Sequence, residues 1–316
     1  MFENAKVGVV VPCYNEELLV GRVIETMPTF VDRIYVIDDL STDGTREKIQ
    51  TYVTEQPDRV TLITHKENQG VGGAIATGYK AALAEQMDVT AVMAGDAQMD
   101  PDDLSRIVAP VARGECDYTK GNRLFRGDAW EIIPRVRYLG NSMISLLTKI
   151  ASGYWHLADS QSGYTAINLL ALERIDWDQM YKRYGQPNDL LVRLNIWMFR
   201  VRDVNVRPIY DIGEKSGIKP LRMIPKLSWL LWRLFIYRMV QKYVIRDFHP
   251  LLFFYGAGLT LLPTGSIVGI YLLIQRLLGT HVAGTSALFS AFLVIMGLQF
   301  LLFAMWFDME YNKDLK

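Results

Sequence analysis

Residues 7–16, Val-Gly-Val-Val-Val-Pro-Cys-Tyr-Asn-Glu, decide the fold class of this chain. Their β-branched half predicts a buried strand, and similar short runs follow at 34–37, 60–63 and 89–93. Longer amphipathic stretches separate these runs. Alternation of this kind predicts βαβ units, and therefore an α/β domain built on a mainly parallel sheet.

Polar residues follow three of the predicted strands. The first strand runs into Asn15 and Glu16, the second into the stretch 38–45, and the fourth into Asp96 and Gln98. Ligands bind at the carboxyl ends of strands in open parallel sheets, and clustered carboxylates there can hold a cation and hydrogen-bond a nucleotide. Each cluster alone also fits a capped turn, but three at successive strand ends favour a binding site.

Composition excludes some classes of protein. Lys and Arg total 34 residues, as do Asp and Glu, so the net charge is zero. A nucleic-acid-binding protein needs a basic excess, so nucleic acid is not an expected partner. Cys13 and Cys116 form neither a zinc spacing nor a redox pair, which fits a reducing compartment. The apolar run at 7–11 is too short for the core of a signal peptide.

The last third of the chain has the composition of membrane-spanning helices. No formally charged residue occurs between Phe248 and Gln275, and after Arg276 none occurs until Asp308. Each stretch exceeds the roughly 20 apolar residues that cross a bilayer. A buried helical hairpin in a soluble core is the alternative, but it would leave both stretches without a solvated face. Because the joining segment at 279–284 is short, we expect a transmembrane hairpin with both ends on one side.

Basic residues crowd the segment before the first predicted span, whereas the hairpin loop carries only Arg276 and His281. This asymmetry predicts an integral membrane protein of two spans, with the α/β domain and both termini in the cytoplasm. Residues 225–247 also combine aromatic side chains with basic residues spaced by four, which predicts an amphipathic helix on anionic headgroups. An ordinary surface helix is the alternative. The basic residues are Lys215, Lys219, Arg222, Lys226, Arg233, Arg238, Lys242 and Arg246.

Six motifs occur in order along residues 6–220. They are Val-Pro-Cys-Tyr-Asn-Glu (11–16), Ile-Asp-Asp-Leu-Ser-Thr-Asp-Gly-Thr (37–45), Asn-Gln-Gly-Val-Gly-Gly-Ala (68–74), Gly-Asn-Arg (121–123), Asp-Ser-Gln-Ser-Gly-Tyr (159–164) and Glu-Lys-Ser-Gly (214–217). Together they resemble the signatures of family 2 glycosyltransferases, in the branch of dolichyl-phosphate mannose synthases and polyprenyl-phosphate hexose synthases. The resemblance implies a GT-A fold, which is a Rossmann-like nucleotide-sugar domain.

The resemblance also implies roles on the donor side of the site. Four residues should line the nucleotide pocket, with Asp39 near the base. Asp96 and Gln98 match the end of the family's Asp-x-Asp-x-Gln segment, which contacts the diphosphate and a divalent cation, Mg²⁺ or Mn²⁺. The nucleotide-pocket residues are Pro12, Tyr14, Glu16 and Asp39.

On the acceptor side, Arg123 and Arg137 match basic positions expected near the acceptor phosphate. Lys215 and Ser216 lie where the family has a flexible basic loop that closes on the diphosphate. The alternatives are ordinary surface arginines, and a lysine that belongs to the membrane-facing basic cluster.

The chain departs from the family pattern at three positions. Ala94 replaces the first Asp of Asp-x-Asp, Thr165 replaces an Arg after Ser-Gly-aromatic, and Asp189 stands for an expected Glu on a later helix. The oxygens of Asp96, Gln98 and the diphosphate itself still suit a hard cation, so we expect an active enzyme.

These observations combine into one expected activity and one domain plan. The resemblance implies an inverting transferase that moves a hexose, with mannose or glucose favoured, from a GDP- or UDP-linked donor to a dolichyl or undecaprenyl phosphate at the cytoplasmic face. Homo-oligomer formation is left open. The plan is a GT-A domain at 1–220, an interfacial helix at 221–247, a transmembrane hairpin at 248–308 and a cytoplasmic tail at 309–316.

Three rival functions are weaker. A nicotinamide-dependent oxidoreductase is disfavoured because Ile75 occupies the last glycine position of Gly-x-Gly-x-x-Gly. A polysaccharide- or glycolipid-synthesising relative would usually carry Gln-x-x-Arg-Trp and more spans. A non-catalytic nucleotide-sugar-binding subunit is suggested only by Ala94.

Overall fold

The computed structural model describes residues 1–124, 135–207, 209 and 220–316, with the backbone alone at 135–139, 141 and 220–224. The chain forms two compact units. The first is Met1–Arg238 together with Leu315–Lys316, and the second is Met239–Asp314. Each unit is described separately below.

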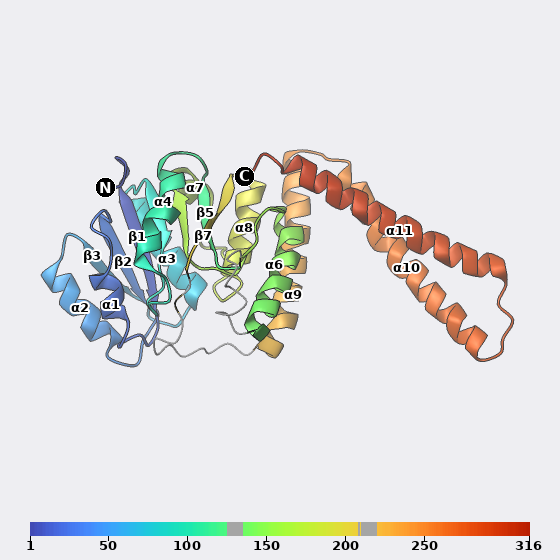
Figure 1. Cartoon of the computed structure of the whole chain (residues 1–316), viewed down its shortest axis with the longest axis horizontal. Helices are drawn as coiled ribbons and strands as arrows, with labels where there is room; N and C mark the ends of the chain where they lie inside the picture. Colours follow the sequence, from blue (N-terminus) through green and yellow to red (C-terminus); the bar gives the residue numbers. More distant parts are fainter. Residues whose placement is uncertain (125–134, 208, 210–219) are drawn as a thin grey trace. The chain divides into compact units, whose positions relative to one another are not determined.

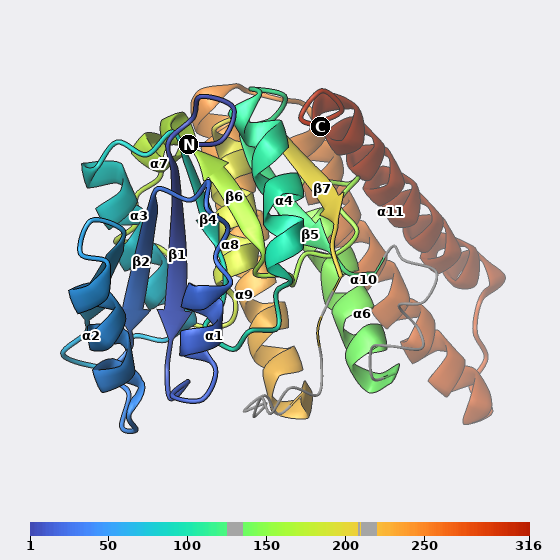
Figure 2. The same ribbon diagram turned by 60° about the vertical axis from the view of Figure 1, so that its left-hand side comes forward.

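Within the described residues, the first unit is built on one seven-stranded sheet in the order β3-β2-β1-β4-β6-β5-β7 (Figures 1 and 2). The strands β3, β2, β1 and β4 are parallel, β6 is antiparallel to both of its neighbours, and β5 and β7 are parallel to each other. The expected α/β class with a mainly parallel sheet is therefore confirmed. The strands are β1 Val7–Cys13, β2 Arg33–Asp38, β3 Val60–Thr64, β4 Val89–Val92, β5 Tyr118–Asn122, β6 Thr165–Asn168 and β7 Val201–Asn205.

Helices cover both faces of this sheet. Alternate β1 side chains enter opposite cores: Val9 packs in the core formed with α1, α2 and α4, and Val10 in the core formed with α3, α7 and α8. Figure 2 shows α4 and α8 on opposite sides of the sheet. The helices are α1 Val20–Glu25, α2 Thr45–Glu55, α3 Val71–Ala84, α4 Leu104–Ala112, α6 Arg135–Ser152, α7 Leu169–Arg174, α8 Gln186–Ile196 and α9 Pro220–Val240.

The predicted helix start at Asp100 is present, but the first turn is tighter than an α-helix. The Asp100 carboxylate accepts a hydrogen bond from the backbone N–H of Asp102, at 3.1 Å. Pro101–Asp103 form a 3₁₀ turn that leads directly into α4. Side-chain capping by Asp with Pro at the first position is the expected chemistry of a helix N-terminus.

The strand directions gather several chain segments at one edge of the sheet. The carboxyl ends of β1, β2 and β4 meet there because these strands are parallel. Since β6 runs antiparallel to β4, with Val92 opposite Thr165, the segment that enters β6 lies at the same edge. The ends of β5 and β7 join them, because β5 is antiparallel to β6 and parallel to β7.

The second unit contains two long apolar helices, α10 Leu251–Leu277 and α11 Gly284–Tyr311, which are long and apolar enough to cross a membrane. Small residues allow them to pack closely, because a Cβ on Gly297 would lie only 2.4 Å from the backbone nitrogen of Leu262. Most of their large apolar side chains are exposed, as expected for a surface that meets lipid rather than water.

A buried polar network lies in the second unit beside the end of α11. The Lys242 ammonium donates to the Asn312 side-chain oxygen at 2.6 Å, and the Tyr243 hydroxyl donates to Asp308 at 2.6 Å. Lys242 and Tyr243 belong to a π-helical segment, Gln241–Arg246, that continues from α9. These bonds satisfy groups that would otherwise be costly to bury.

The predicted amphipathic helix at 221–247 is helical, as α9 followed by the π-helical segment. One face of α9 packs in the first unit through Leu227, Leu230 and Leu234. The other face exposes apolar side chains, with Trp229 63% and Trp232 45% accessible. The expected contact of Arg238 and Lys242 with headgroups is wrong, because both side chains are buried and hydrogen-bonded within the protein. The position of the helix on a membrane surface remains a prediction.

The chain returns to the first unit after the two apolar helices. The carbonyl of Leu315 accepts a hydrogen bond from the N–H of Val201 on β7, at 3.1 Å. The Leu315 side chain is 5% exposed and belongs to the core that contains α3, α7 and α8. Both ends of the segment 239–314 are thus continuous with the same compact unit.

Replacing Leu315 with Ala should destabilise the first unit by about 2 kcal/mol, because a buried Leu loses packing and leaves a cavity. Thermal unfolding of the full chain in detergent, followed by circular dichroism, measures the change. Leu278→Ala is the matched control, since Leu278 is largely exposed. Equal melting temperatures for the two variants would contradict this role for Leu315.

Candidate active site

The loops after β1 and β2 are joined by side-chain hydrogen bonds at the carboxyl edge. The Asn15 N–H donates to the Ser41 hydroxyl at 3.0 Å, and the Thr42 N–H donates to the Asn15 side chain at 2.8 Å. The Glu16 N–H donates to the Thr45 hydroxyl at 2.8 Å. The polar residues that follow these two strands therefore fix the conformation of both loops.

Three of the predicted nucleotide-pocket residues lie on or beside the end of β1. Pro12 is buried within the strand, while the Tyr14 ring is 48% exposed beyond it. Partial burial, together with the negative charges of Asp96 and Asp43, raises the pKa of the Glu16 carboxyl to about 7. Glu16 and Asp96 come from different strand ends, so this repulsion shows that the two loops approach each other.

Asp39, the fourth of these residues, is buried and bonded within the protein. Its Oδ1 accepts from the Gln69 N–H at 2.8 Å, and its Oδ2 accepts from the Gly70 N–H at 2.7 Å. The Nδ1 atom of His65 lies 2.7 Å from Oδ1, and its Nε2 atom lies 2.9 Å from the Thr77 hydroxyl. The Asp39 carboxylate thus holds the start of α3 against the end of β2, and its predicted place near the base stays a prediction.

The loop after β4 carries Asp96 and Gln98 around a sharp turn. Ala97 adopts a left-handed backbone with φ of +55°, and the Gln98 N–H donates to the Asp96 carboxylate at 3.1 Å. The turn also passes close to β1, because a Cβ on Gly95 would lie 2.5 Å from the Cys13 sulfur.

Left-handed backbone at residues other than glycine recurs after each of the three strands that carry predicted site residues. Asn15 follows β1 with φ of +58°, Leu40 follows β2 with φ of +65°, and Ala97 follows β4. Such conformations are costly for residues with a Cβ and concentrate at functional sites. Their positions support a site at this edge of the sheet.

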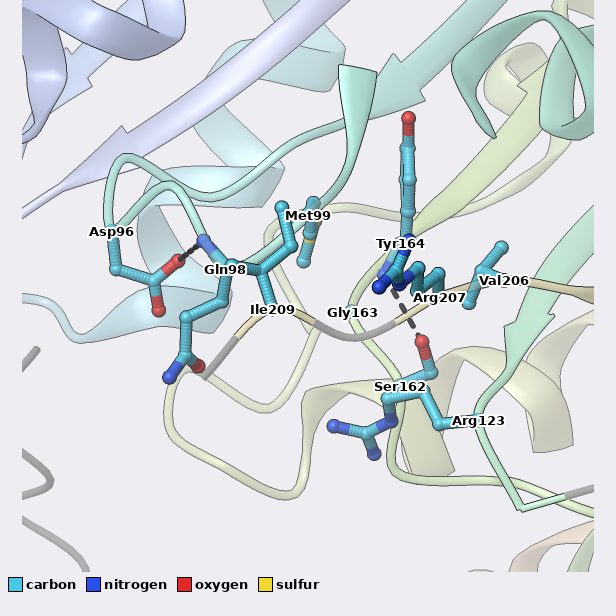
Figure 3. Close-up of a pocket in the computed structure, with 10 residues that line it drawn as sticks. All are labelled: Asp96, Gln98, Met99, Arg123, Ser162, Gly163, Tyr164, Val206, Arg207 and Ile209. Carbon is cyan, nitrogen blue, oxygen red and sulfur yellow. Dashed lines mark hydrogen bonds between the residues drawn. The ribbon is translucent and has the colours of Figure 1, made fainter. Parts of the chain in front are cut away.

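A pocket opens at the same edge (Figure 3). It brings Asp96 and Gln98 from β4 together with Arg123 from the end of β5. The segment after β7 closes one side, because the Ile209 N–H donates to the Gln98 carbonyl at 3.1 Å. The described residues that line the pocket are Asp96, Gln98, Met99, Arg123, Ser162, Gly163, Tyr164, Val206, Arg207 and Ile209.

Arg123 is fixed by an ion pair behind the pocket. Its Nε lies 2.7 Å from Asp159 Oδ2, and its Nη2 lies 3.2 Å from Asp159 Oδ1. Burial alone would raise the pKa of Asp159, but the charge and hydrogen bonds of Arg123 and the charge of Lys120 lower it. Burial also lowers the pKa of the Lys120 ammonium, to about 8.

The structure thus places Asp96, Gln98 and Arg123 in one pocket, with Glu16 close to Asp96. Arg137 lies in α6, but its side chain is not among those described, and Lys215 and Ser216 lie outside the described residues. Asp189 is buried and accepts from the Tyr181 N–H at 2.7 Å and from Arg193 at 2.9 Å.

Sequence reasoning missed one cationic residue of the pocket, Arg207, and one buried partner, His65. Arg207 lines the pocket, and its backbone N–H donates to the Asp103 carboxylate at 2.7 Å. The signal that could have found it is the segment 201–206, in which three valines are interspersed with polar residues as in a strand with one buried face, and which is followed directly by Arg207. No comparable signal marks His65, because its pairing with Asp39 depends on the fold.

The residues present fit a divalent cation only in part. Within the described portion of the chain, no cluster of three or more His, Cys, Asp or Glu side chains is placed to hold a metal. The Asp96 carboxylate and the Gln98 amide do offer oxygens from one turn (Figure 3). Hard cations such as Mg²⁺ keep few protein ligands when substrate phosphates supply the others, so this donor set suits a cation that binds with a diphosphate.

Similar proteins act on polyprenyl phosphates. The chain is 28% identical over 213 residues to a UDP-N-acetylglucosamine–dolichyl-phosphate N-acetylglucosaminyltransferase of Methanococcus voltae, with 64% of this chain and 84% of that protein covered. It is 30% identical over 217 residues to an undecaprenyl-phosphate mannosyltransferase of Micrococcus luteus, covering 67% of this chain and 87% of that protein.

A solved structure supports the fold. Glucosyl-3-phosphoglycerate synthase from Mycobacterium tuberculosis, in complex with Mn²⁺, UDP and phosphoglyceric acid, aligns with a TM-score of 0.54 and 20% identity. The alignment covers 74% of this chain and 78% of that one. The sequence profile of glycosyl transferase family 2 matches residues 8–176, the part of the chain that carries β1 to β6 and most of the pocket residues. The chain therefore belongs to glycosyl transferase family 2.

Proposed function

We propose that this protein transfers a hexose from a nucleoside-diphosphate sugar to a polyprenyl phosphate at a membrane surface. The observation that carries the proposal is one pocket in which an acidic turn, Asp96 and Gln98, faces the arginines Arg123 and Arg207. We propose that the acidic turn binds a cation-bound diphosphate and that the arginines bind an acceptor phosphate. The apolar helices α10 and α11 supply a reason for a lipid acceptor.

The chemistry needs little from a general base. A phosphate monoester has a second pKa near 6, so the acceptor is largely dianionic at neutral pH and is already a nucleophile. One of its oxygens would form a bond to the anomeric carbon while the bond from that carbon to the diphosphate oxygen breaks. In-line displacement of this kind inverts the configuration, and the released electron pair stays on the nucleoside diphosphate.

The protein must therefore bring two anions together. Arg123 would hold the acceptor phosphate, since a guanidinium binds phosphate with paired hydrogen bonds. Arg207 lies in the same pocket and adds a second positive charge. By the roles that the family implies, Arg137 is proposed to complete this side, and Lys215 and Ser216 are proposed to close on the diphosphate of the donor.

On the donor side, acidic residues rather than arginines are needed, because they bind the cation that neutralises the diphosphate. Asp96 and Gln98 would hold a Mg²⁺ or Mn²⁺ ion, which would neutralise charge on the departing diphosphate. Pro12, Tyr14 and Glu16 lie at the adjoining strand end, where the base and ribose would bind. Two oxygens from one turn leave room for diphosphate oxygens as further ligands.

The sugar is the least constrained part of the proposal. The similar proteins include enzymes named for mannose and for N-acetylglucosamine, and mannose or glucose remain our preferred sugars. The test is incubation of the full chain in membranes with radiolabelled GDP-mannose, UDP-glucose and UDP-N-acetylglucosamine, followed by lipid extraction. Label in an acid-labile polyprenyl product supports the function, and no lipid product from any donor would contradict it.

Replacing Asp96 with Asn should abolish nearly all transfer. The change keeps the size and one oxygen but removes the negative charge at the proposed cation site, which should cost several kcal/mol, or more than roughly a hundredfold in rate. Asp100→Asn is the control, because Asp100 caps the turn before α4 and Asn is an equally good cap. Near-normal, chelator-insensitive transfer by Asp96→Asn would exclude the assignment.

Replacing Glu16 with Gln should stabilise the protein at high pH. The pKa of this carboxyl is about 7 in the folded protein and 4.5 in a model compound, so folding is weakened progressively as pH rises from about 4.5 through 7. Glu16 is only half-buried, so solvent screening reduces the expected gain at pH 8 to about 1 kcal/mol.

Melting temperatures of the full chain with chelator, at pH 5 and pH 8, measure this effect. We expect Glu16→Gln to melt higher than the wild type at pH 8, and the difference to be much smaller at pH 5, because most of the weakening develops between pH 5 and pH 7. Glu67→Gln, at an exposed position, should show no difference at either pH. An unchanged melting temperature for Glu16→Gln at pH 8 would contradict the proposed repulsion between Glu16 and the neighbouring carboxylates.

The membrane topology gives a further expectation. Since the segment 239–314 leaves from and returns to the first unit, α10 and α11 should form a hairpin that crosses the bilayer twice. A cysteine at Thr280, between the two helices, should react with an impermeant reagent added outside cells. A cysteine at Glu67 should react only after permeabilisation, and the reverse pattern would contradict the orientation.

A further inference from the structure

We propose that Asp159 is a positioning residue that fixes the Arg123 guanidinium in the orientation needed for the acceptor phosphate. The proposal rests on the proposed function of the pocket and assigns a role to a residue that does not itself line it. The proposal also assigns a role to the segment 159–162, which connects Arg123 with α6, the helix that includes Arg137.

The Arg123–Asp159 pair has the geometry of a rigid fork. The two side-chain contacts are 2.7 Å and 3.2 Å, and the Arg123 backbone N–H lies 3.3 Å from Oδ2 of the same carboxylate. The arginine side chain is 23% exposed and that of Asp159 is fully buried. A planar guanidinium bound through two nitrogens cannot rotate freely, so its plane is set before a ligand arrives.

Asp159 is itself held in place on more than one side. Its Oδ1 accepts from the Gln161 N–H at 3.0 Å, which closes a tight turn. The buried Lys120 ammonium donates to the Ser162 carbonyl in the same segment, and its charge acts on Asp159. A carboxylate with these partners is a fixed support rather than a mobile surface group.

Ser160 and Gln161, the two residues after Asp159, form hydrogen bonds with the helices α6 and α8. The Ser160 N–H and hydroxyl each lie 3.1 Å from the Ser145 hydroxyl on α6. The Gln161 amide donates to Asn188 on α8 at 2.8 Å, and Thr148 of α6 donates to the same Asn188 oxygen at 3.1 Å. Apart from Gln161, which is partly exposed, these residues are buried.

The segment therefore connects Arg123 with the helix α6. Arg123 is fixed through Asp159, and α6, which includes Arg137, is held directly through Ser160 and indirectly through the Asn188 oxygen that Gln161 also binds. An ion pair that served only to stabilise the sheet would have no reason to affect one substrate more than the other. A positioning role predicts that disturbing Asp159 weakens acceptor binding and spares the donor.

The experiment compares Asp159→Asn with wild type in the full chain, in detergent with added lipid. Three quantities are measured: the affinity for nucleoside diphosphate, the affinity for a short-chain polyprenyl phosphate, and the KM and kcat for transfer to that lipid. We expect about a tenfold loss of lipid affinity, the same rise in KM, and a change of less than about twofold in nucleoside diphosphate affinity, since a tenfold change corresponds to the loss of one moderate interaction.

A double-mutant comparison separates positioning from a general structural effect. If Asp159 acts through Arg123, then Arg123→Ala combined with Asp159→Asn should bind lipid no worse than Arg123→Ala alone. Asp117→Asn is the matched control, because Asp117 also pairs with an arginine, Arg200, but precedes the opposite end of β5. It should leave both lipid affinity and KM unchanged.

The outcomes distinguish the possibilities. Unchanged lipid affinity in Asp159→Asn, or additive losses in the double variant, would overturn the proposal. Wild-type protein that binds the lipid in an Asp159-dependent way but transfers nothing to it would instead contradict the proposed function. If Asp159→Asn no longer binds nucleoside diphosphate, Asp159→Glu replaces it. This variant keeps the charge but shifts the fork, and the same loss of lipid affinity is expected.

Discussion

The antiparallel pairing of β6 with β4 is the constraint on which the site depends. In a sheet of parallel strands alone, the segment entering a strand and the loop leaving its neighbour lie at opposite edges. Here the pairing of Val92 with Thr165 brings the entrance of β6 beside the turn that carries Asp96 and Gln98. β5 and β7 run antiparallel to β6 and therefore in the direction of β4, so Arg123 and Arg207 follow strand ends at that same edge. One reversed strand thus adds the segment that enters β6, with Ser162 and Tyr164, to the edge where the acidic and basic residues meet.

The acidic and basic halves of the pocket differ in their electrostatics because their charged residues have different neighbours. Asp96 lies near Glu16, so the acidic half is destabilised by repulsion that a cation would relieve. The basic half is balanced internally, because Arg123 and Lys120 are accompanied by the buried Asp159. The carboxylates of the acidic side repel each other, while Arg123 on the basic side is held by hydrogen bonds to Asp159.

Local patterns in the sequence were sufficient for part of this description. The β-branched runs at 7–11, 34–37, 60–63 and 89–93 correspond to β1 to β4, and the polar residues after them lie at one sheet edge as predicted. The uncharged stretches correspond to α10 and α11. What could not be predicted depends on contacts between residues that are distant in the sequence. Asp159 forms an ion pair with Arg123, 36 residues away, and the Asp39 carboxylate is hydrogen-bonded by His65 and Gly70. Such partners come together only in the folded chain, so secondary-structure propensity and hydrophobic periodicity do not predict them.

The packing of Leu315 in the core of the first unit has a consequence for the order in which the chain can fold during its synthesis. Domains generally fold as they emerge, beginning from the N-terminus. Here the core around α3, α7 and α8 lacks one of its side chains, and β7 lacks one hydrogen-bond acceptor, until residues beyond α11 have been made. Both apolar helices precede Leu315 in the chain, so they must be translated before this core closes. Completion of the transferase unit is thereby coupled to the arrival of its own membrane segment.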